Sequence, residues 1–199
     1  MAIQVPSAIK LPNNWTYPAI LYKIIDLGTQ ENKKFGTTAR IFDFTFELPT
    51  ETKEFDWIMK PLVVSREYAI SMNDKANLPK MLYALNGWIE ITDEQKKTFD
   101  GRDWIGKQCT ITVDHNDSWY PIIVSVAPTV KWMAVQTQFN NSIFMDLDMN
   151  IQEINDIFVT LPEFIQKKIK SSPEFLAKSD EYIKKIEEFV WENEGQVPF

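Results

Sequence analysis

Hydrophobic and polar positions alternate over three stretches in the first part of the chain, at the period of two that is typical of β-strands. These stretches are residues 17–28, 35–48 and 62–71, and each predicts a strand. A short polar turn separates the first two. Residues 49–61 separate the second and third, and we expect them to form a charged loop that contains Trp57.

The second stretch has the clearest alternation. One of its faces carries the apolar residues Phe42, Phe44, Phe46 and Leu48. The other face carries the polar residues Asp43, Thr45 and Glu47. This pattern predicts that the first face lies in the core and that the second is exposed to water.

The period then changes to that of α-helices. Residues 75–88 predict a helix with Pro79 in its first turn, where the missing N–H of proline is tolerated. Thr92 is placed to cap a second short helix that ends near Phe99.

Alternation returns in residues 107–115 and 120–126, and the polar turn between them predicts a β-hairpin. Three strands, a helical segment and a hairpin make the element order of an OB-fold, a five-stranded Greek-key barrel. We therefore expect a mainly β body at residues 17–128, with inserted helices. An N-terminal arm at residues 1–16 is expected to precede it.

The last part of the chain has helical periodicity. Residues 129–150 show no strong period and are expected to be a linker. Two short helices are expected within residues 151–170. Ser172, followed by proline and an acid, predicts the start of another helix, and an apolar stripe runs from Phe175 to Val190. Residues 151–199 are thus expected to form an α-helical C-terminal region.

Composition excludes several classes of protein. With Cys109 as the single cysteine, the chain has no disulfide framework, and the reducing cytoplasm is the expected setting. His115 is the single histidine, which excludes a histidine-rich metal site. The six glycines form no phosphate-binding loop, and no pair of carboxylates forms a catalytic motif. We expect no enzyme activity, no metal, no cofactor and, without an apolar run of about 20 residues, no membrane span.

The net charge of −7 is unevenly distributed. Residues 134–199 contain twelve Asp or Glu and six Lys, whereas residues 1–133 contain sixteen Asp or Glu and fifteen Lys or Arg. The acidity therefore lies in the C-terminal third, and the nearly neutral body can still carry a basic groove.

The body resembles a family of bacteriophage single-stranded-DNA-binding proteins built on an OB-fold. The resemblance covers roughly residues 17–128 and rests on the order of short blocks. They are Tyr17-Pro18-Ala19, Ile24 to Gln30, Phe46 to Pro49, Lys60-Pro61, Val64 to Tyr68, Lys75 to Leu78, Phe99-Asp100, Ile105 to Lys107 and Cys109. The resemblance implies an OB-fold, phage origin, the host cytoplasm and a role in replication or recombination. The chain departs from the family at residues 85–88, where the family often has an Arg-rich turn, and beyond Pro128.

A protein that binds single strands needs cations along the phosphates and aromatic rings that stack on bases. The turn between the first two strands offers Lys33, Lys34, Phe35 and Arg40. The other candidates are Trp57 and Lys60 in the expected loop, Arg66 and Tyr68 on one face of the third strand, and Trp119 at the hairpin turn. Each has a structural alternative: a solvated turn for the basic group, core packing for Trp57 and Tyr68, and the barrel rim for Arg66.

The last residues are similar to the tip of bacterial single-stranded-DNA-binding proteins, in which acidic residues precede an aliphatic residue, Pro and Phe. We expect Val197, Pro198 and Phe199 to dock replication or recombination proteins, and the acidic segment to compete with DNA for the groove. The rival hypothesis is a virion structural or protein-interaction module that uses the barrel and helical tail for assembly. The oligomeric state stays open.

Overall fold

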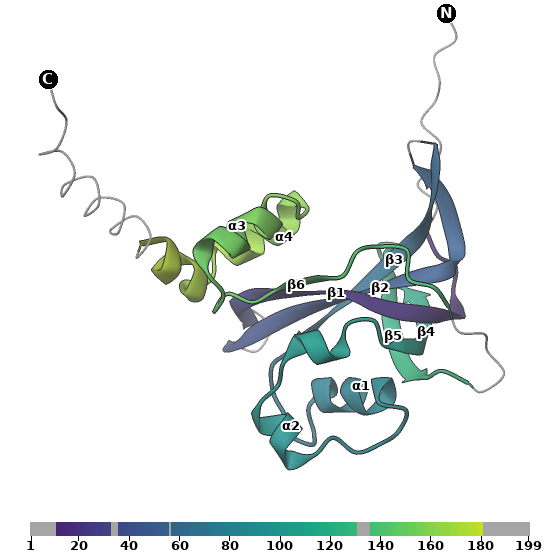
Figure 1. Cartoon of the computed structure of the whole chain (residues 1–199), viewed down its shortest axis with the longest axis horizontal. Coiled ribbons are helices and arrows are strands. Elements are labelled where there is room, and N and C mark those ends of the chain that lie inside the picture. Colours follow the sequence, from purple (N-terminus) through teal and green to yellow (C-terminus); the bar gives the residue numbers. More distant parts are fainter. Residues whose placement is uncertain (1–10, 33–35, 56, 131–135, 181–199) are drawn as a thin grey trace, which may run out of the picture. The chain divides into compact units, whose positions relative to one another are not determined.

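The computed structural model describes residues 11–32, 36–55, 57–130 and 136–180 (Figure 1). The fold is mixed α/β, with a mostly antiparallel six-stranded sheet and C-terminal helices, and the sheet is not closed into a barrel. The strands are β1 (Trp15–Asn32), β2 (Thr37–Phe55), β3 (Ile58–Ala69), β4 (Gln108–His115), β5 (Pro121–Pro128) and β6 (Ile143–Met145). The helices are α1 (Asn77–Leu85), α2 (Asp93–Lys97), the 3-10 helix η1 (Gly101–Trp104), α3 (Ile151–Phe158) and α4 (Glu163–Lys170).

The strand order is β3-β2-β1-β4-β5, and β6 pairs with β1. The chain divides into two compact units, and the three long strands take part in both. The first unit comprises residues 1–23, 44–66 and 71–142, and the second comprises residues 24–43, 67–70 and 143–199. The predicted boundaries after residues 16, 128 and 150 do not coincide with this division.

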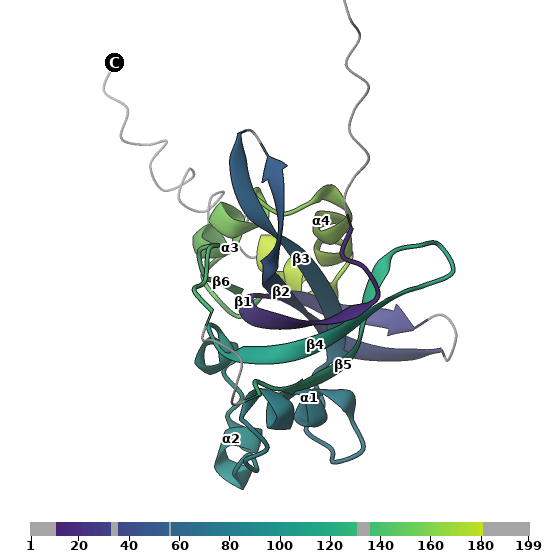
Figure 2. The same ribbon diagram turned by 90° about the vertical axis from the view of Figure 1, so that its right-hand side faces the viewer.

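In the first unit, β4 pairs antiparallel with the beginning of β1 on one side and with β5 on the other (Figure 2). Tyr17 of β1 lies opposite Ile111 of β4, and both side chains are buried. Helix α1 packs against β5 and β4, with Leu78 and Leu82 buried. The core of this unit therefore lies between α1 and the inner face of these strands.

The second unit has its own apolar core. Ile25 and Leu27 of β1 are covered by residues from β6 and the two helices that follow it. The covering residues are Met145, Leu147, Ile154, Phe158, Leu161, Ile165 and Ile169. The segment predicted as a linker thus contains a strand and buried side chains.

The prediction of a charged loop at residues 49–61 is wrong. β2 continues to Phe55 and β3 begins at Ile58, so the two strands extend into a hairpin whose turn contains Trp57 (Figure 2). The backbone hydrogen bonds of the β-ladder do not depend on side-chain polarity, so a charged sequence can continue a strand.

The predicted water-exposed face of β2 is also wrong, because Asp43, Thr45 and Glu47 are buried. In the first unit, the Glu47 carboxylate accepts hydrogen bonds from the backbone N–H groups of Phe139 (2.7 Å) and Asn140 (2.9 Å). The Asn140 side-chain amide donates a third, at 2.7 Å. A buried carboxylate is tolerated when donors satisfy it, and here a distant segment supplies them.

The predictions of helix starts are confirmed. Pro79 lies in the first turn of α1. Thr92 caps α2 in a capping box, because its hydroxyl accepts from the N–H of Gln95 while the Gln95 side chain accepts from the N–H of Thr92. Ser172 precedes a helix that runs over residues 173–180, and its hydroxyl accepts from the N–H of Phe175 at 3.3 Å.

Candidate nucleic-acid interface

Three tryptophans in the first unit have left-handed backbone conformations. Trp57, Trp88 and Trp119 have φ of 65°, 64° and 59°, and they are the non-glycine residues with positive φ among those that the structure describes. Bulky residues rarely adopt this conformation, and such strain clusters at functional sites. The three side chains are 94%, 53% and 77% exposed. Turns that usually take glycine or asparagine therefore present large aromatic rings to solvent.

The Trp119 turn is held by one polar side chain. Asn116 Oδ1 accepts hydrogen bonds from the backbone N–H groups of Ser118 and Tyr120, both at 3.0 Å. The N–H of Trp119 donates to the carbonyl of Asn116 at 2.8 Å. These bonds fix the β4–β5 turn and leave the rings of Trp119 and Tyr120 exposed.

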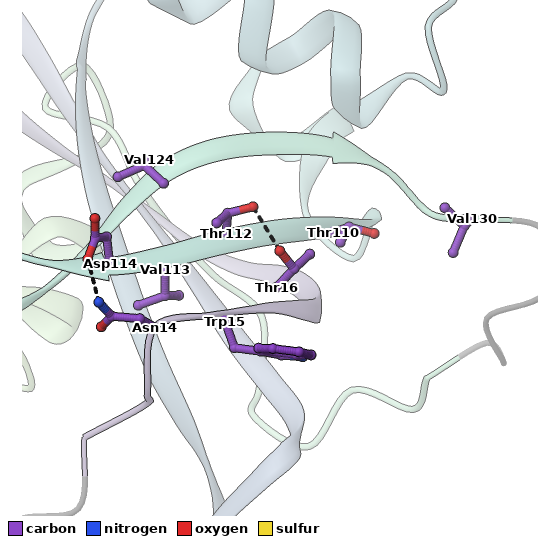
Figure 3. A pocket seen from close by; sticks show the side chains of 9 residues that line it. All are labelled: Asn14, Trp15, Thr16, Thr110, Thr112, Val113, Asp114, Val124 and Val130. Atoms are coloured by element: carbon purple, nitrogen blue, oxygen red, sulfur yellow. Dashed lines mark hydrogen bonds between the residues drawn. The ribbon is translucent and has the colours of Figure 1, made fainter.

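A shallow groove of about 540 Å³ begins beside Trp15, at the start of β1 (Figure 3). It is lined by Asn14, Trp15, Thr16, Thr110, Thr112, Val113, Asp114, Val124 and Val130. The Trp15 side chain is 71% exposed. The groove thus combines an exposed ring with apolar and hydroxyl-bearing side chains, the elements of a surface that can stack and hydrogen-bond with a base or sugar.

Hydroxyl groups connect three strands across the floor of this region. The Thr16 and Thr112 hydroxyls are 3.0 Å apart, and Ser125 Oγ donates to Thr112 Oγ1 at 2.9 Å. Asp114 accepts from the Asn14 side-chain amide at 2.6 Å. No lysine or arginine lines the groove within the part of the chain that the structure describes. Phosphate contacts would therefore have to come from residues other than these nine lining residues.

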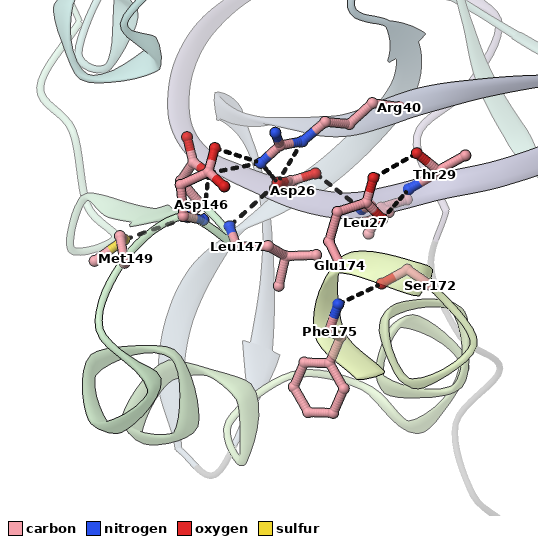
Figure 4. Close-up of polar contacts among 12 residues, drawn as sticks. Asp26, Leu27, Thr29, Arg40, Asp146, Leu147, Met149, Ser172, Glu174 and Phe175 are labelled. Carbon is pink, nitrogen blue, oxygen red and sulfur yellow. Dashed lines mark hydrogen bonds and ion pairs between the residues drawn. The ribbon is translucent and has the colours of Figure 1, made fainter. Parts of the chain in front are cut away.

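Arg40, a predicted DNA contact, lies in a cluster of carboxylates in the second unit (Figure 4). Its guanidinium donates to Asp26 (2.9 Å from Nε), Asp146 (2.8 Å) and Asp148 (3.0 Å). Burial would lower the pKa of Arg40, but the hydrogen bonds and charge of Asp26 outweigh it and raise the pKa. This environment favours a structural role for Arg40 over contact with DNA.

The remaining predicted residues are dispersed. Arg66 donates to the carbonyl of Ile123 at 2.8 Å, and Lys60 is half-buried near the hairpin turn. Tyr68 is buried, as its structural alternative anticipates. Trp57 is almost fully exposed, so it does not pack under a loop. Lys33, Lys34, Phe35, Val197, Pro198 and Phe199 lie outside the described residues.

Trp15 and Tyr120 are the residues that sequence reasoning missed. Trp15 falls in the predicted N-terminal arm, although it begins β1, and Tyr120 falls in a predicted strand, although it is exposed beside the turn. A signal for Trp15 exists in the sequence: a tryptophan directly before an apolar strand, in a segment that otherwise breaks regular structure.

Neither protein-family models nor curated proteins give a match to this chain. Within the described ranges, no helix is long and apolar enough to cross a membrane. Over the same residues, no group of three or more His, Cys, Asp or Glu side chains is arranged to hold a metal ion.

Proposed function

We propose that this chain is an OB-fold protein that binds single-stranded DNA without strong sequence preference, in phage replication or recombination. The strand order supports this fold, because in a Greek-key barrel of this kind the first strand pairs with both the second and the fourth. Arg66 of β3 reaches the Ile123 carbonyl of β5, so the two outer strands approach each other at an open seam. OB-folds are themselves only partly closed barrels.

One observation carries the proposed activity: Trp119 is held outward by a left-handed turn between β4 and β5. This is one of the loops with which OB-folds bind oligonucleotides. Stacking of a base on an aromatic ring contributes about 1–3 kcal/mol and needs no particular base, since every base has a π-face. Trp15 and the hydroxyl groups of Thr16 and Ser125 extend the surface with a second ring and with hydroxyl oxygens that can accept hydrogen bonds from base N–H groups.

The test is a titration of the full chain with oligo-dT at low salt, followed by tryptophan fluorescence. Quenching is expected, and Trp119→Ala should weaken binding by about 5- to 150-fold, the equivalent of one lost base stack. Trp88→Ala is the matched control, because Trp88 also has positive φ but its ring packs against Tyr83 at 5.1 Å. Absence of quenching in the wild type, or equal loss in both variants, would refute the proposal.

The acidic C-terminal segment is proposed to serve partners and to mask the DNA-binding surface. The negative charges of this segment compete with phosphates for the same cations, and salt weakens both interactions. Removal of the residues from about 190 onward should therefore tighten DNA binding and abolish binding of replication or recombination proteins through Val197, Pro198 and Phe199. Unchanged behaviour in both assays contradicts this role.

A virion structural or protein-interaction module is the second candidate. It is favoured by the lack of cations among the described residues that line the groove and by the exposed apolar residues of the β2–β3 hairpin. Under this function the oligo-dT titration gives no quenching, so the same experiment separates the two candidates.

A further inference from the structure

A carboxylate stands on the wall of the groove beside Trp15, and one of its oxygens is held while the other is open. Asp114 Oδ1 accepts hydrogen bonds from the side-chain amide of Asn14 at 2.6 Å and from the backbone N–H of His115 at 2.7 Å. Asp114 Oδ2 accepts none from the residues that the structure describes. Figure 3 shows one carboxylate oxygen bonded to Asn14 and the other turned away from it. Two donors thus fix the carboxylate and leave Oδ2 as an oriented acceptor.

The groove beside Trp15, which we call the Trp15 groove, suits an uncharged ligand. Asp114 is the single charged residue among the described residues that line it. A negative charge without a neighbouring cation repels a phosphate. The volume of about 540 Å³ lies within the range of about 300–1,000 Å³ that is usual for small-ligand sites, and the exposed Trp15 ring offers a stacking surface. The Trp15 groove therefore fits a nucleobase better than the sugar–phosphate backbone.

Polar contacts join the Trp15 groove to the exposed ring of Trp119. The Nδ1 atom of His115 is hydrogen-bonded to Asn14 Oδ1, and the His115 ring packs against the Trp119 ring with centroids 5.9 Å apart. Asn14 directly precedes Trp15 in β1, so a continuous chain of contacts runs from Trp119 to the groove wall. A strand that stacks on Trp119 therefore has the Trp15 groove as a neighbouring site for another base.

The exocyclic amino group of a base matches an oriented carboxylate oxygen. Cytosine, adenine and guanine carry this N–H donor, whereas thymine and uracil have only carbonyl oxygens outside the ring. We infer that the Trp15 groove is a subsite for one amino-bearing base, which stacks on Trp15 and donates to Asp114 Oδ2. The inference rests on the proposed binding of single-stranded DNA and adds a modest preference at one position. Bases that only stack are accepted alike, so the strand as a whole is still bound without strong sequence preference.

The test compares oligo-dC with oligo-dU of equal length. The amino group of cytosine is replaced by a carbonyl in uracil, while the two rings have the same size. Binding of the labelled oligonucleotides to the full chain is followed by fluorescence anisotropy at neutral pH and at one salt concentration. Oligo-dC should bind about 2- to 12-fold more tightly, which is the effect of one net hydrogen bond. The ratio of the two affinities cancels the phosphate contribution, because the backbones are the same.

The substitution Asp114→Asn gives the sharper result. The side-chain oxygen of the asparagine takes the position of Oδ1, where two donors meet, so its NH₂ group replaces Oδ2 and becomes a donor. A donor at this point suits the carbonyl of uracil, and the preference should reverse in favour of oligo-dU. Asp117→Asn is the matched control. It removes the same charge from an exposed aspartate of the β4–β5 turn that does not line the groove, and it should leave the ratio unchanged.

The possible outcomes separate this inference from the proposed function. Equal affinity of the wild type for both oligonucleotides overturns the inference and leaves the proposed function intact, whereas failure to bind either one refutes both. A preference for oligo-dC that survives Asp114→Asn, or that changes equally in Asp117→Asn, also overturns the inference. Trp15→Ala supplies an independent check: a base that does not stack is not held against Oδ2, so the ratio should fall toward one. An unchanged ratio in Trp15→Ala places the recognition of the amino group outside the Trp15 groove.

Discussion

Gly28 is the position at which a single added methyl group should do the most damage to the second unit. Its φ is +71°, and a Cβ built on it would lie 2.3 Å from Ser172 Cβ and 2.4 Å from Ser172 Oγ. Ser172 has little freedom to move, because it is fully buried and its hydroxyl donates to the carbonyl of Ile169 at 2.7 Å. Figure 4 shows Ser172 at the start of the helix that approaches β1.

The cost of Gly28→Ala has two parts. The left-handed conformation costs an alanine about 1–2 kcal/mol. Crowding against a buried neighbour costs about 1–3 kcal/mol more. The variant should therefore lose about 2–5 kcal/mol, a large share of the roughly 5–15 kcal/mol that stabilises a typical domain.

Gly36→Ala is the matched control. Gly36 has a similar φ of +61°, but no atom lies within 4 Å of its Cβ position. It should lose only the backbone part, and the gain from a stiffer unfolded chain is common to both variants. Urea unfolding followed by circular dichroism measures the difference. Equal losses in Gly28→Ala and Gly36→Ala would show that Ser172 does not constrain this position.

Two further predictions concern the carboxylates. Burial alone would raise the pKa of Glu174, but hydrogen bonds from the Thr29 hydroxyl and N–H lower this pKa below 4.5. The stabilising effect of the Glu174 carboxylate is therefore complete above pH 4.5, and it is lost as the pH falls through the lowered pKa. The protection factors of the amides in residues 173–180, taken relative to an unstructured peptide at the same pH, should therefore fall in acid, and a Thr29→Val variant with the same pH dependence as the wild type contradicts this account. Glu47→Gln should cost about 1–3 kcal/mol in urea unfolding, because it places an amide donor against the N–H groups of Phe139 and Asn140. Glu31→Gln, at an exposed position, should change stability by less than about 0.5 kcal/mol, and equal effects of the two variants would exclude a special role for Glu47.

The existence of the strands and helices could be predicted from the sequence, whereas their ends could not. Alternation marks a strand only where apolar and polar side chains occupy opposite faces. The end of β2 near Phe55 belongs to a two-stranded hairpin that is largely exposed, so no such contrast exists there. Thr92 and Ser172 could be predicted because helix caps depend on residues within one turn.

The burial of Glu47 and the environment of Arg40 depend on segments far away in the chain. Asn140 donates to Glu47, and Asp146 and Asp148 bind Arg40, from more than ninety residues downstream. Lys33 and Lys34 lie close to Arg40 in the sequence, and together they predict a basic turn. Local sequence patterns carry no information about such pairing. A cation such as Arg40, which the sequence predicts as a DNA contact, can therefore neutralise carboxylates within the protein instead.

The candidate interface could be predicted in part. The sequence predicts Trp119 at a hairpin turn, and the structure adds that the turn has positive φ and leaves the ring exposed. Trp15 was missed because its strand begins earlier than the periodicity indicates. The outward direction of each ring follows from backbone dihedrals, which a single sequence does not reveal for a residue as rarely left-handed as tryptophan.

The core of the second unit has a consequence for biosynthesis. Ile25 and Leu27 emerge early from the ribosome, but the other fully buried members of their core begin only at Met145. Because protein synthesis adds roughly 5–20 residues per second, these apolar side chains stay exposed on the nascent chain for on the order of ten seconds. A nascent chain that stalls before Met145 would hold an uncovered apolar strand, and we expect chaperones to bind there.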